Sequence, residues 1–245
     1  MKKLFILFVM LPFMAVSTNA QSNLKGDINE DGAVDISDVV ELVNIILNGS
    51  NIQSYLTCPD DHHPHLIDLG LPSGTKWACC NVGAESPEDY GGYYAWGETE
   101  EKDWYDRDTY IHNQNGSYVN LGEIAGTEYD VVHVKWGGSW VMPSRDQIVE
   151  LINNCTYEWT TLNGVNGRRF TGPNGGIILL PAAGFRSNGN LSQAGSNGYY
   201  WSSSQSGSLE EYAVDIAFSN SSNGWRWNID GRRHRGFSVR PVVKQ

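Results

Sequence analysis

The sequence lacks long apolar segments apart from one near its N-terminus. The run extends from Leu4 to Val16, two lysines precede it, and Thr18-Asn19-Ala20 follow it. This order of a basic, an apolar and a small-residue segment is typical of an export signal, and we expect cleavage after Ala20. No other segment approaches the roughly 20 apolar residues that a membrane-spanning helix needs. We therefore expect a secreted, periplasmic or cell-surface protein without a membrane span.

Basic residues are scarce. The chain has 17 Lys and Arg against 28 Asp and Glu, a net charge of −11, and removal of Lys2 and Lys3 with the signal leaves −13. The negative charge argues against a nucleic-acid partner, because nucleic acid attracts basic surfaces. Acidic residues are concentrated between Glu85 and Asp130, and five arginines are grouped near the C-terminus. We expect the acidic residues to neutralise the charge of these arginines inside the domain. An anion-binding site formed by the arginines is the alternative. The five arginines are Arg226, Arg232, Arg233, Arg235 and Arg240.

Cysteine is also sparse. The four cysteines, Cys58, Cys79, Cys80 and Cys155, lie in the exported part, where oxidising conditions and an even count favour up to two disulfides. If Trp77–Cys80 is a strand, Cys79 and Cys80 face opposite sides and find different partners. We expect pairs Cys80–Cys155 and Cys58–Cys79. A metal or redox role for the vicinal cysteines is the alternative, although a Cys-x-x-Cys spacing is absent.

Recognisable catalytic motifs are absent. The sequence has no His-Glu-x-x-His, no phosphate-binding glycine loop and no Ser-His-Asp order. A glycosidase needs two carboxylates about 5 to 10 Å apart in a cleft, and the acidic residues that gather are interpreted as a solvated loop. They are Glu98, Glu100, Glu101 and Asp103. The run Asp60–His65 contains possible metal ligands but is better interpreted as a spacer. We expect no catalytic residues, and an enzyme remains the alternative.

What the sequence does contain predicts four segments: a signal peptide over 1–20, a compact unit over 21–50, a linker over 51–65 and one globular domain over 66–245. The domain is rich in Gly, Trp, Tyr, Asn and Ser, with short apolar runs between turn residues, which predicts an α+β fold of many short strands and long loops. Ser144 and Gln147 form a capping box, which predicts a helix over Ser144–Asn153. A weaker helix is expected over Ser86–Tyr90. Residues 236–242 predict a final buried strand with Arg240 paired internally.

A calcium loop is predicted over Asp27–Asp38. Oxygen side chains stand at loop positions one, three, five, nine and twelve, and Gly32 at position six permits the sharp turn. Position seven supplies a backbone carbonyl. The expected Ca²⁺ ligands are Asp27, Asn29, Asp31, Ala33, Asp35 and Asp38. The alternative is an acidic surface turn before an amphipathic helix.

The loop ends in Asp38, where the general EF-hand pattern has Glu, and it therefore resembles one type I dockerin repeat of cellulose-degrading assemblies. An apolar helix is expected to follow, carrying Val39, Leu42, Val43 and Ile46. Dockerins that bind cohesin modules usually have two repeats, and this chain has one. The resemblance implies attachment to a cohesin-like or surface protein. The helix needs the main domain, a second copy or a partner to cover its apolar surface.

Six stretches of the main domain resemble the Fibrobacter succinogenes major paralogous domain family of exported proteins. The stretches are residues 67–78, 89–98, 137–143, 180–184, 198–204 and 236–242. The resemblance implies a C-type-lectin-like fold, distantly related to formylglycine-generating enzymes, in which a loop-rich structure brings its two ends together. It implies no function, because one fold hosts many.

Site motifs of that fold are missing. Calcium-dependent lectins use Glu-Pro-Asn or Gln-Pro-Asp with Trp-Asn-Asp, and only the stretched version Trp227–Asp230 occurs here. The cysteines also do not form the copper-binding pattern of formylglycine-generating enzymes.

Aromatic residues are the main positive signal for binding, because their faces stack on sugars. The chain has nine tryptophans and twelve tyrosines. Trp77, Trp96, Trp140 and Trp201, within the family stretches, are interpreted as packing residues. Trp104, Tyr105, Trp225 and Trp227, in polar surroundings, are the candidate carbohydrate contacts.

The sequence thus predicts a secreted, calcium-binding, non-catalytic binding or scaffold module for glycans or surface partners in polysaccharide catabolism. An enzyme on a C-type-lectin-like fold and a receptor-binding or display protein are the alternatives.

Overall fold

The structure is a computed structural model that describes residues 36, 66–207, 209–220 and 225–243, with the backbone alone over 225–230. The chain divides into two units, Met1–Asn48 and Gly49–Gln245. In the first unit only Ile36 is described, and it is helical and exposed. The calcium-loop residues and Cys58 lie outside the described residues. The described part of the second unit is a strand-rich α+β domain, as expected at the level of α+β with many short strands.

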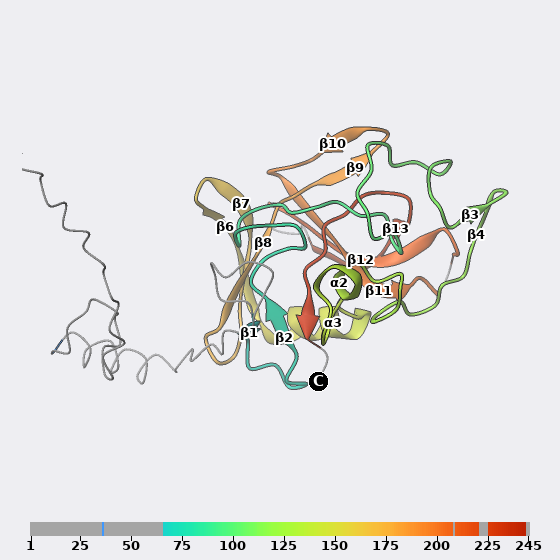
Figure 1. Cartoon of the computed structure of the whole chain (residues 1–245). Helices are drawn as coiled ribbons and strands as arrows, with labels where there is room; N and C mark the ends of the chain where they lie inside the picture. Colours follow the sequence, from blue (N-terminus) through green and yellow to red (C-terminus); the bar gives the residue numbers. More distant parts are fainter. Residues whose placement is uncertain (1–35, 37–65, 208, 221–224, 244–245) are drawn as a thin grey trace, which may run out of the picture. The chain divides into compact units, whose positions relative to one another are not determined.

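One sheet joins the beginning and the end of the domain. It consists of β1 (Leu66–Asp68), β2 (Lys76–Ala78), β14 (Val242–Val243) and β5 (Trp140–Val141), in that spatial order. Every neighbouring pair in the sheet is antiparallel. In Figure 1 the red C-terminal strand lies beside the blue-green first strands. The two ends of the domain therefore meet in one layer.

The remaining strands form two three-stranded sheets and two hairpins. The sheets are β6 (Thr156–Leu162), β7 (Val165–Thr171) and β8 (Ile177–Pro181), and β11 (Asn197–Gln205), β12 (Tyr212–Ser219) and β13 (Trp225–Arg232). The hairpins are β3 (Asn113–Gln114) with β4 (Ser117–Tyr118), and β9 (Phe185–Ser187) with β10 (Asn190–Ser192). Long loops connect these small sheets, as the density of turn residues predicts.

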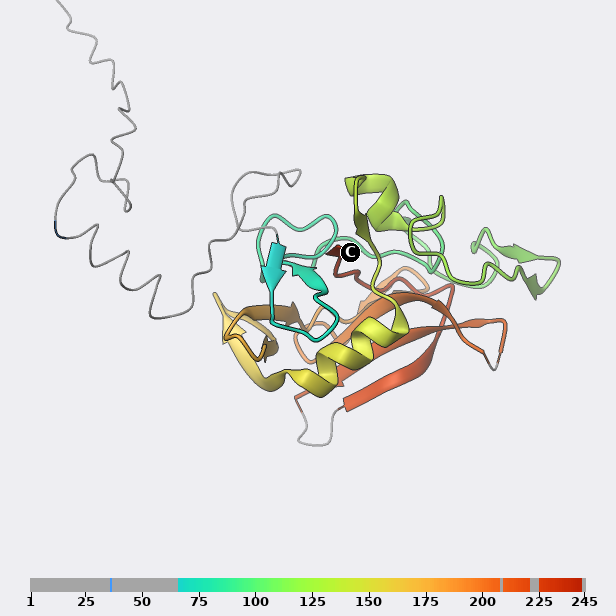
Figure 2. The ribbon, with the colours of Figure 1, turned by 90° about the horizontal axis from the view of Figure 1, so that it is seen from below.

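The domain has two helices in its described part, α2 (Val131–Trp136) and α3 (Arg145–Asn154). The predicted capping box at the start of α3 is confirmed: Ser144 accepts from the Gln147 N–H, and the Gln147 side chain accepts from the Ser144 N–H. Ile148 and Leu151 are buried, and α3 lies along β11 and β12 (Figure 2). None of the helices in the described ranges is long and apolar enough to cross a membrane.

The weaker helix prediction, over Ser86–Tyr90, is wrong. This stretch is a turn, because the Asp89 carboxylate accepts the backbone N–H groups of Glu85 and Ser86 and closes a loop there. A helix that the sequence analysis missed is α2. Its N-cap Asp130 accepts from Val132 and His133 within the helix, and from Gly126 and Met142 outside it.

The four tryptophans of the family stretches are buried, which confirms their prediction as packing residues. Two of them, Trp96 and Trp201, also use their indole N–H groups inside the domain, whereas Trp77 Nε1 is buried without a partner among the described residues. Trp96 Nε1 donates to the Ser202 carbonyl at 2.8 Å, and Trp201 Nε1 donates to the Tyr94 carbonyl at 2.8 Å. The Trp201 ring stacks on Phe237, with centroids 4.2 Å apart. These indoles join distant segments of the chain into one core.

The C-terminal segment is buried as predicted, although its regular strand is confined to Val242–Val243. Phe237 and Val239 lie in the same core cluster. Arg240 is almost fully buried, and its guanidinium donates to Asn81 Oδ1 and to carbonyl oxygens of β2, β8 and Cys79. Arg240 is therefore paired internally, with neutral acceptors.

The predicted disulfide between Cys80 and Cys155 is not formed. Cys155 is a buried free thiol that packs with Ile148 and Leu151, whereas Cys80 packs with Cys79 and Ala84 in another cluster. Burial, followed by the nearby Glu150 carboxylate, raises the pKa of Cys155 to about 11. The condition for Cys79 and Cys80 to face opposite sides, a strand over Trp77–Cys80, is not met, because β2 ends at Ala78. Cys58, the partner expected for Cys79, lies outside the described residues.

Candidate binding surface

Three carboxylates of the acidic loop are engaged in contacts within the domain. Glu98, which we expected to be solvated, is buried and accepts from Lys102 Nζ and the Ile111 N–H. Glu100 pairs with Lys135 at 3.0 Å, and Glu101 accepts the Tyr93 N–H. Asp103 is exposed. The first three carboxylates therefore hold the loop together.

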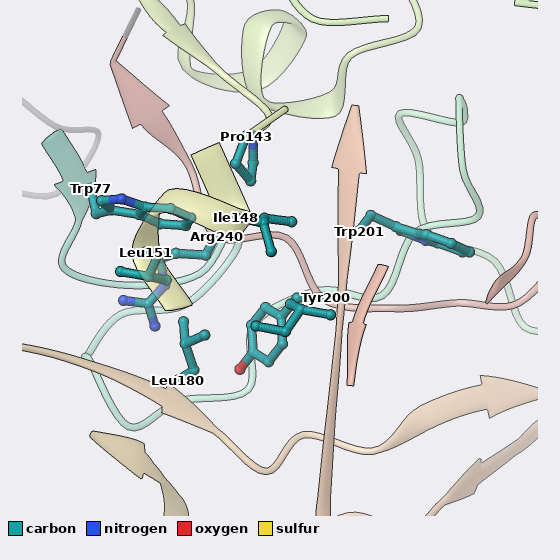
Figure 3. A pocket seen from close by; sticks show the side chains of 9 residues that line it. Trp77, Pro143, Ile148, Leu151, Leu180, Tyr200, Trp201 and Arg240 are labelled. Carbon is teal, nitrogen blue, oxygen red and sulfur yellow. The ribbon is translucent and has the colours of Figure 1, made fainter. Parts of the chain in front are cut away.

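An internal cavity is too small for a sugar. Its volume is about 10 Å³, close to the smallest space that holds one water. Trp77, Ile148 and Tyr200 are among its mostly apolar lining side chains, as Figure 3 shows. This cavity therefore cannot hold a ligand larger than water.

Trp104 lies on the outer surface of the domain with a fixed ring. The side chain is 51% exposed, and its Nε1 donates to Asp106 Oδ2 at 2.6 Å. Asp106 is held in turn, because its Oδ1 accepts the Thr109 N–H at 2.8 Å and the Asp108 N–H at 3.0 Å. These hydrogen bonds, that of Thr109 foremost, lower the pKa of Asp106, so the carboxylate is ionised at neutral pH. Trp104 thus offers an apolar face in a predefined orientation.

Tyr105 is not a carbohydrate contact, and its prediction is wrong. The side chain is fully buried, and its hydroxyl donates to the Tyr93 carbonyl. Gly236 permits this position, since a Cβ there would come within 2.7 Å of the Tyr105 ring. Trp104 and Asp106, the residues on either side, are bonded to each other on the outside of the same loop. The side chains of Trp225 and Trp227 lie outside the description, while their backbone belongs to β13.

The Trp104 loop runs along the edge of the β9–β10 hairpin (Figure 1). The Asn188 N–H donates to the Tyr105 carbonyl at 3.1 Å, and the Arg186 N–H donates to the Gly236 carbonyl at 2.8 Å. The turn residue Gly189 has a φ of +74°, and a Cβ there would lie 2.9 Å from the Trp104 ring. Glycine is therefore required twice: for the left-handed turn conformation and for contact with the indole.

Pairing across the hairpin places polar side chains in one row. Ser187 pairs with Asn190 in the hairpin, and Arg186 pairs with Gly236, so Arg235 stands next to Ser187 on the same face. Consistent with this, the Arg235 guanidinium lies over the Phe185 ring, 5.0 Å from its centroid. We call this surface the hairpin face. It comprises Trp104, Asp106, Ser187, Asn190 and Arg235.

His234 connects the two halves of the hairpin face electrostatically. Its Nδ1 bonds to the Tyr118 hydroxyl at 2.9 Å. Burial, followed by the charges of Arg232 and Arg235, lowers the pKa of His234 to about 4, with Asp106 and Glu211 opposing the shift. Asp106 and Arg235 thus both lie close enough to act on His234. His234 is neutral at physiological pH.

Sequence analysis found Trp104 but missed Asp106 and Arg235. A tryptophan followed two residues later by a turn-forming aspartate is a weak local signal for such a fixed ring. Nothing local to Arg235 shows that it lies beside the hairpin.

The ligands of the predicted calcium loop lie outside the described residues. Within the described ranges, no three His, Cys, Asp or Glu side chains gather in a metal-binding group.

The chain is similar to one protein family over its C-terminal part. The family model, described as a domain of unknown function (DUF8237), matches residues 141–242. No curated protein and no solved structure matches the chain. The matched residues include the β9–β10 hairpin and Arg235 but not the Trp104 loop.

Proposed function

We propose that this chain is a secreted, non-catalytic module that binds glycans through the hairpin face. The observation that carries the proposal is the half-exposed Trp104 ring, whose orientation Asp106 fixes and which lies against the Gly189 turn. A flat apolar ring stacks on the apolar face of a pyranose, and a ring that is already ordered loses little conformational entropy on binding. Neighbouring Ser187 and Asn190 side chains offer hydrogen bonds to sugar hydroxyls.

The proposal includes a C-type-lectin-like fold and a relation to the Fibrobacter succinogenes major paralogous domain family. Two features support it: the first and last strands share one sheet, and the aromatic residues of the family stretches form the core. The absence of the lectin calcium tripeptides fits a sugar site built on an aromatic ring instead of a metal ion.

The proposal also gives the N-terminal segment a role as a calcium-binding attachment element. Its support is the oxygen ligands in dockerin-like register in the sequence. Calorimetric titration of the signal-free protein should show one Ca²⁺ bound per chain, and a double variant, Asp27→Asn with Asp31→Asn, should lose that binding. Retained binding in the double variant would rule out this loop as the site.

The glycan proposal is tested by titrating the signal-free protein against an array of plant and host polysaccharides. We expect saturable binding that Trp104→Ala weakens at least tenfold, because loss of one stacked ring removes about 1.5 kcal/mol or more. Tyr157→Ala is a matched control, since Tyr157 is 42% exposed on β6, in a different sheet. Equal losses in both variants, or no binding by the wild type, would contradict the proposal. The second result would favour a display protein with protein partners.

A further inference from the structure

Arg235 carries a positive charge that no carboxylate in the described structure neutralises. The ion pairs among the described residues join Lys102 to Glu98, Lys135 to Glu100 and Arg169 to Glu158, and none includes Arg235. Its Nε is buried and has no acceptor within the described ranges. Within the described ranges, the expected compensation by the acidic segment therefore finds no carboxylate partner for Arg235. An arginine without a carboxylate partner among the described residues is notable in a chain with a net charge of −11.

The surroundings of Arg235 hold the guanidinium in place without neutralising it. The planar group lies over the Phe185 ring, which binds one face and leaves in-plane N–H groups for an acceptor. His234 is neutral, and Ser187 and Asn190 are uncharged. Asp106 is the acidic residue of the hairpin face, and its two oxygens already accept from Trp104, Asp108 and Thr109.

Trp104 presents a stacking ring beside the turn of the same hairpin. Trp104 touches the hairpin at Gly189, and Arg235 stands beside Ser187, two residues before the turn glycine. A ligand that fits both groups has an apolar sugar face and an anionic group on the same chain. Guanidinium N–H groups bind a carboxylate or sulfate through two parallel hydrogen bonds, which a neutral hydroxyl cannot match.

We propose that the glycans bound by the hairpin face are acidic, and that Arg235 binds their carboxylate while Trp104 stacks on a sugar ring. The inference rests on the proposed glycan-binding function and names the substrate class of that same surface. Uronate-containing polysaccharides are the ligands of this chemistry.

The test compares sugars that differ only in charge. Oligogalacturonate, hyaluronan and chondroitin oligosaccharides are each titrated beside their carboxyl-reduced forms, by calorimetry at low and at physiological salt. We expect at least one acidic form to bind at least tenfold more tightly than its reduced form, and the difference to shrink as salt rises. Equal affinity for the acidic and reduced forms would overturn the inference.

Variants at Arg235 assign the charge effect to one residue. Arg235→Gln should remove the tenfold preference, so that the acidic and the reduced forms bind with similar affinity. Arg235→Lys should restore only part of the preference, because an ammonium lacks the planar pair of donors. Arg169→Gln, which removes the same charge from an exposed residue on β7, should leave the preference unchanged. A preference that persists in Arg235→Gln, with a native thermal melt, would overturn the assignment.

Failure of this inference is distinguishable from failure of the proposed function. If the protein binds neutral and acidic sugars equally and Trp104→Ala lowers both affinities, the charge preference is refuted and the glycan proposal stands. Acidic sugars bound equally well by the wild type and by Trp104→Ala would refute the glycan platform itself.

Discussion

Trp96 and Trp104 stand eight residues apart and have opposite environments. Trp96 is fully buried, and its Nε1 bonds to a carbonyl of β11. Trp104 is 51% exposed, and its Nε1 bonds to a carboxylate of its own loop. The two tryptophans differ in the group that accepts their indole N–H. A backbone carbonyl of another element anchors the Trp96 ring in the core. A nearby aspartate instead orients the Trp104 ring toward an external ligand. The predictions below test this distinction.

The largest expected effect on stability comes from removing the core tryptophan Trp201. Trp201→Ala should reduce the free energy of unfolding by about 3–5 kcal/mol, because it removes a fully buried ring, its stack on Phe237 and its bond to the Tyr94 carbonyl. Urea unfolding followed by circular dichroism measures the change. A loss below about 1 kcal/mol would mean that Trp201 is not a core residue.

A smaller effect on stability is expected from His234, which lies next to Arg235 in the sequence. The pKa of His234 is lowered to about 4 in the folded protein, whereas an unfolded histidine titrates near 6.5. As the pH falls, the unfolded chain therefore takes up this proton before the folded protein does. His234 has no effect on the free energy of unfolding above about pH 6.5, and it lowers that free energy as the pH falls from about 6.5 toward 4. The loss approaches about 3 kcal/mol.

His234→Asn isolates this contribution, since the carboxylates titrate alike in both proteins. Unfolding free energies measured from pH 7 to pH 4 should fall less steeply in the variant than in the wild type. Parallel curves would show that His234 is protonated as easily in the folded state as in the unfolded one.

Loss of the exposed indole should affect stability least. Trp104→Ala should change the free energy of unfolding by less than about 1 kcal/mol, because half of the side chain already contacts solvent. The same variant should lose at least tenfold in glycan affinity, as argued above. Urea unfolding of Trp104→Ala beside Trp201→Ala measures the contrast, and similar losses in both would erase it.

The residue that orients Trp104 should have an intermediate effect on binding. Asp106→Asn keeps the size of the side chain but replaces an ionised acceptor by an amide, which weakens the bond to Trp104 Nε1. We expect a two- to fivefold loss of glycan affinity with little change in stability. Calorimetric titration measures it, and an affinity equal to that of the wild type would mean that orientation of the ring is unimportant.

Features encoded in adjacent residues were predictable from the sequence. The capping box of Ser144 and Gln147 gave the start of α3, and the burial of the family-stretch tryptophans followed from their small apolar neighbours. Helix α2 was missed because its cap, Asp130, is also held by the distant Met142 N–H. Local propensity does not contain that contact.

The hairpin face was only partly predictable for the same reason. Three segments, around residues 104, 188 and 235, form it through backbone bonds that no local pattern announces. Tyr105 was misassigned because its polar neighbours suggested exposure, whereas Gly236, far along the chain, leaves room for its ring inside. Arg235 was assigned to internal compensation because charge totals do not show which acids lie within reach.

The most direct test of the central claim is a nuclear magnetic resonance titration of the ¹⁵N-labelled protein with the glycan that binds most tightly. We predict that the indole N–H signal of Trp104, assigned by its loss in Trp104→Phe, shifts in a saturable manner, while the indole signals of Trp96 and Trp201 stay in place. A Trp104 signal that does not move at saturating glycan would contradict the hairpin face as the binding surface.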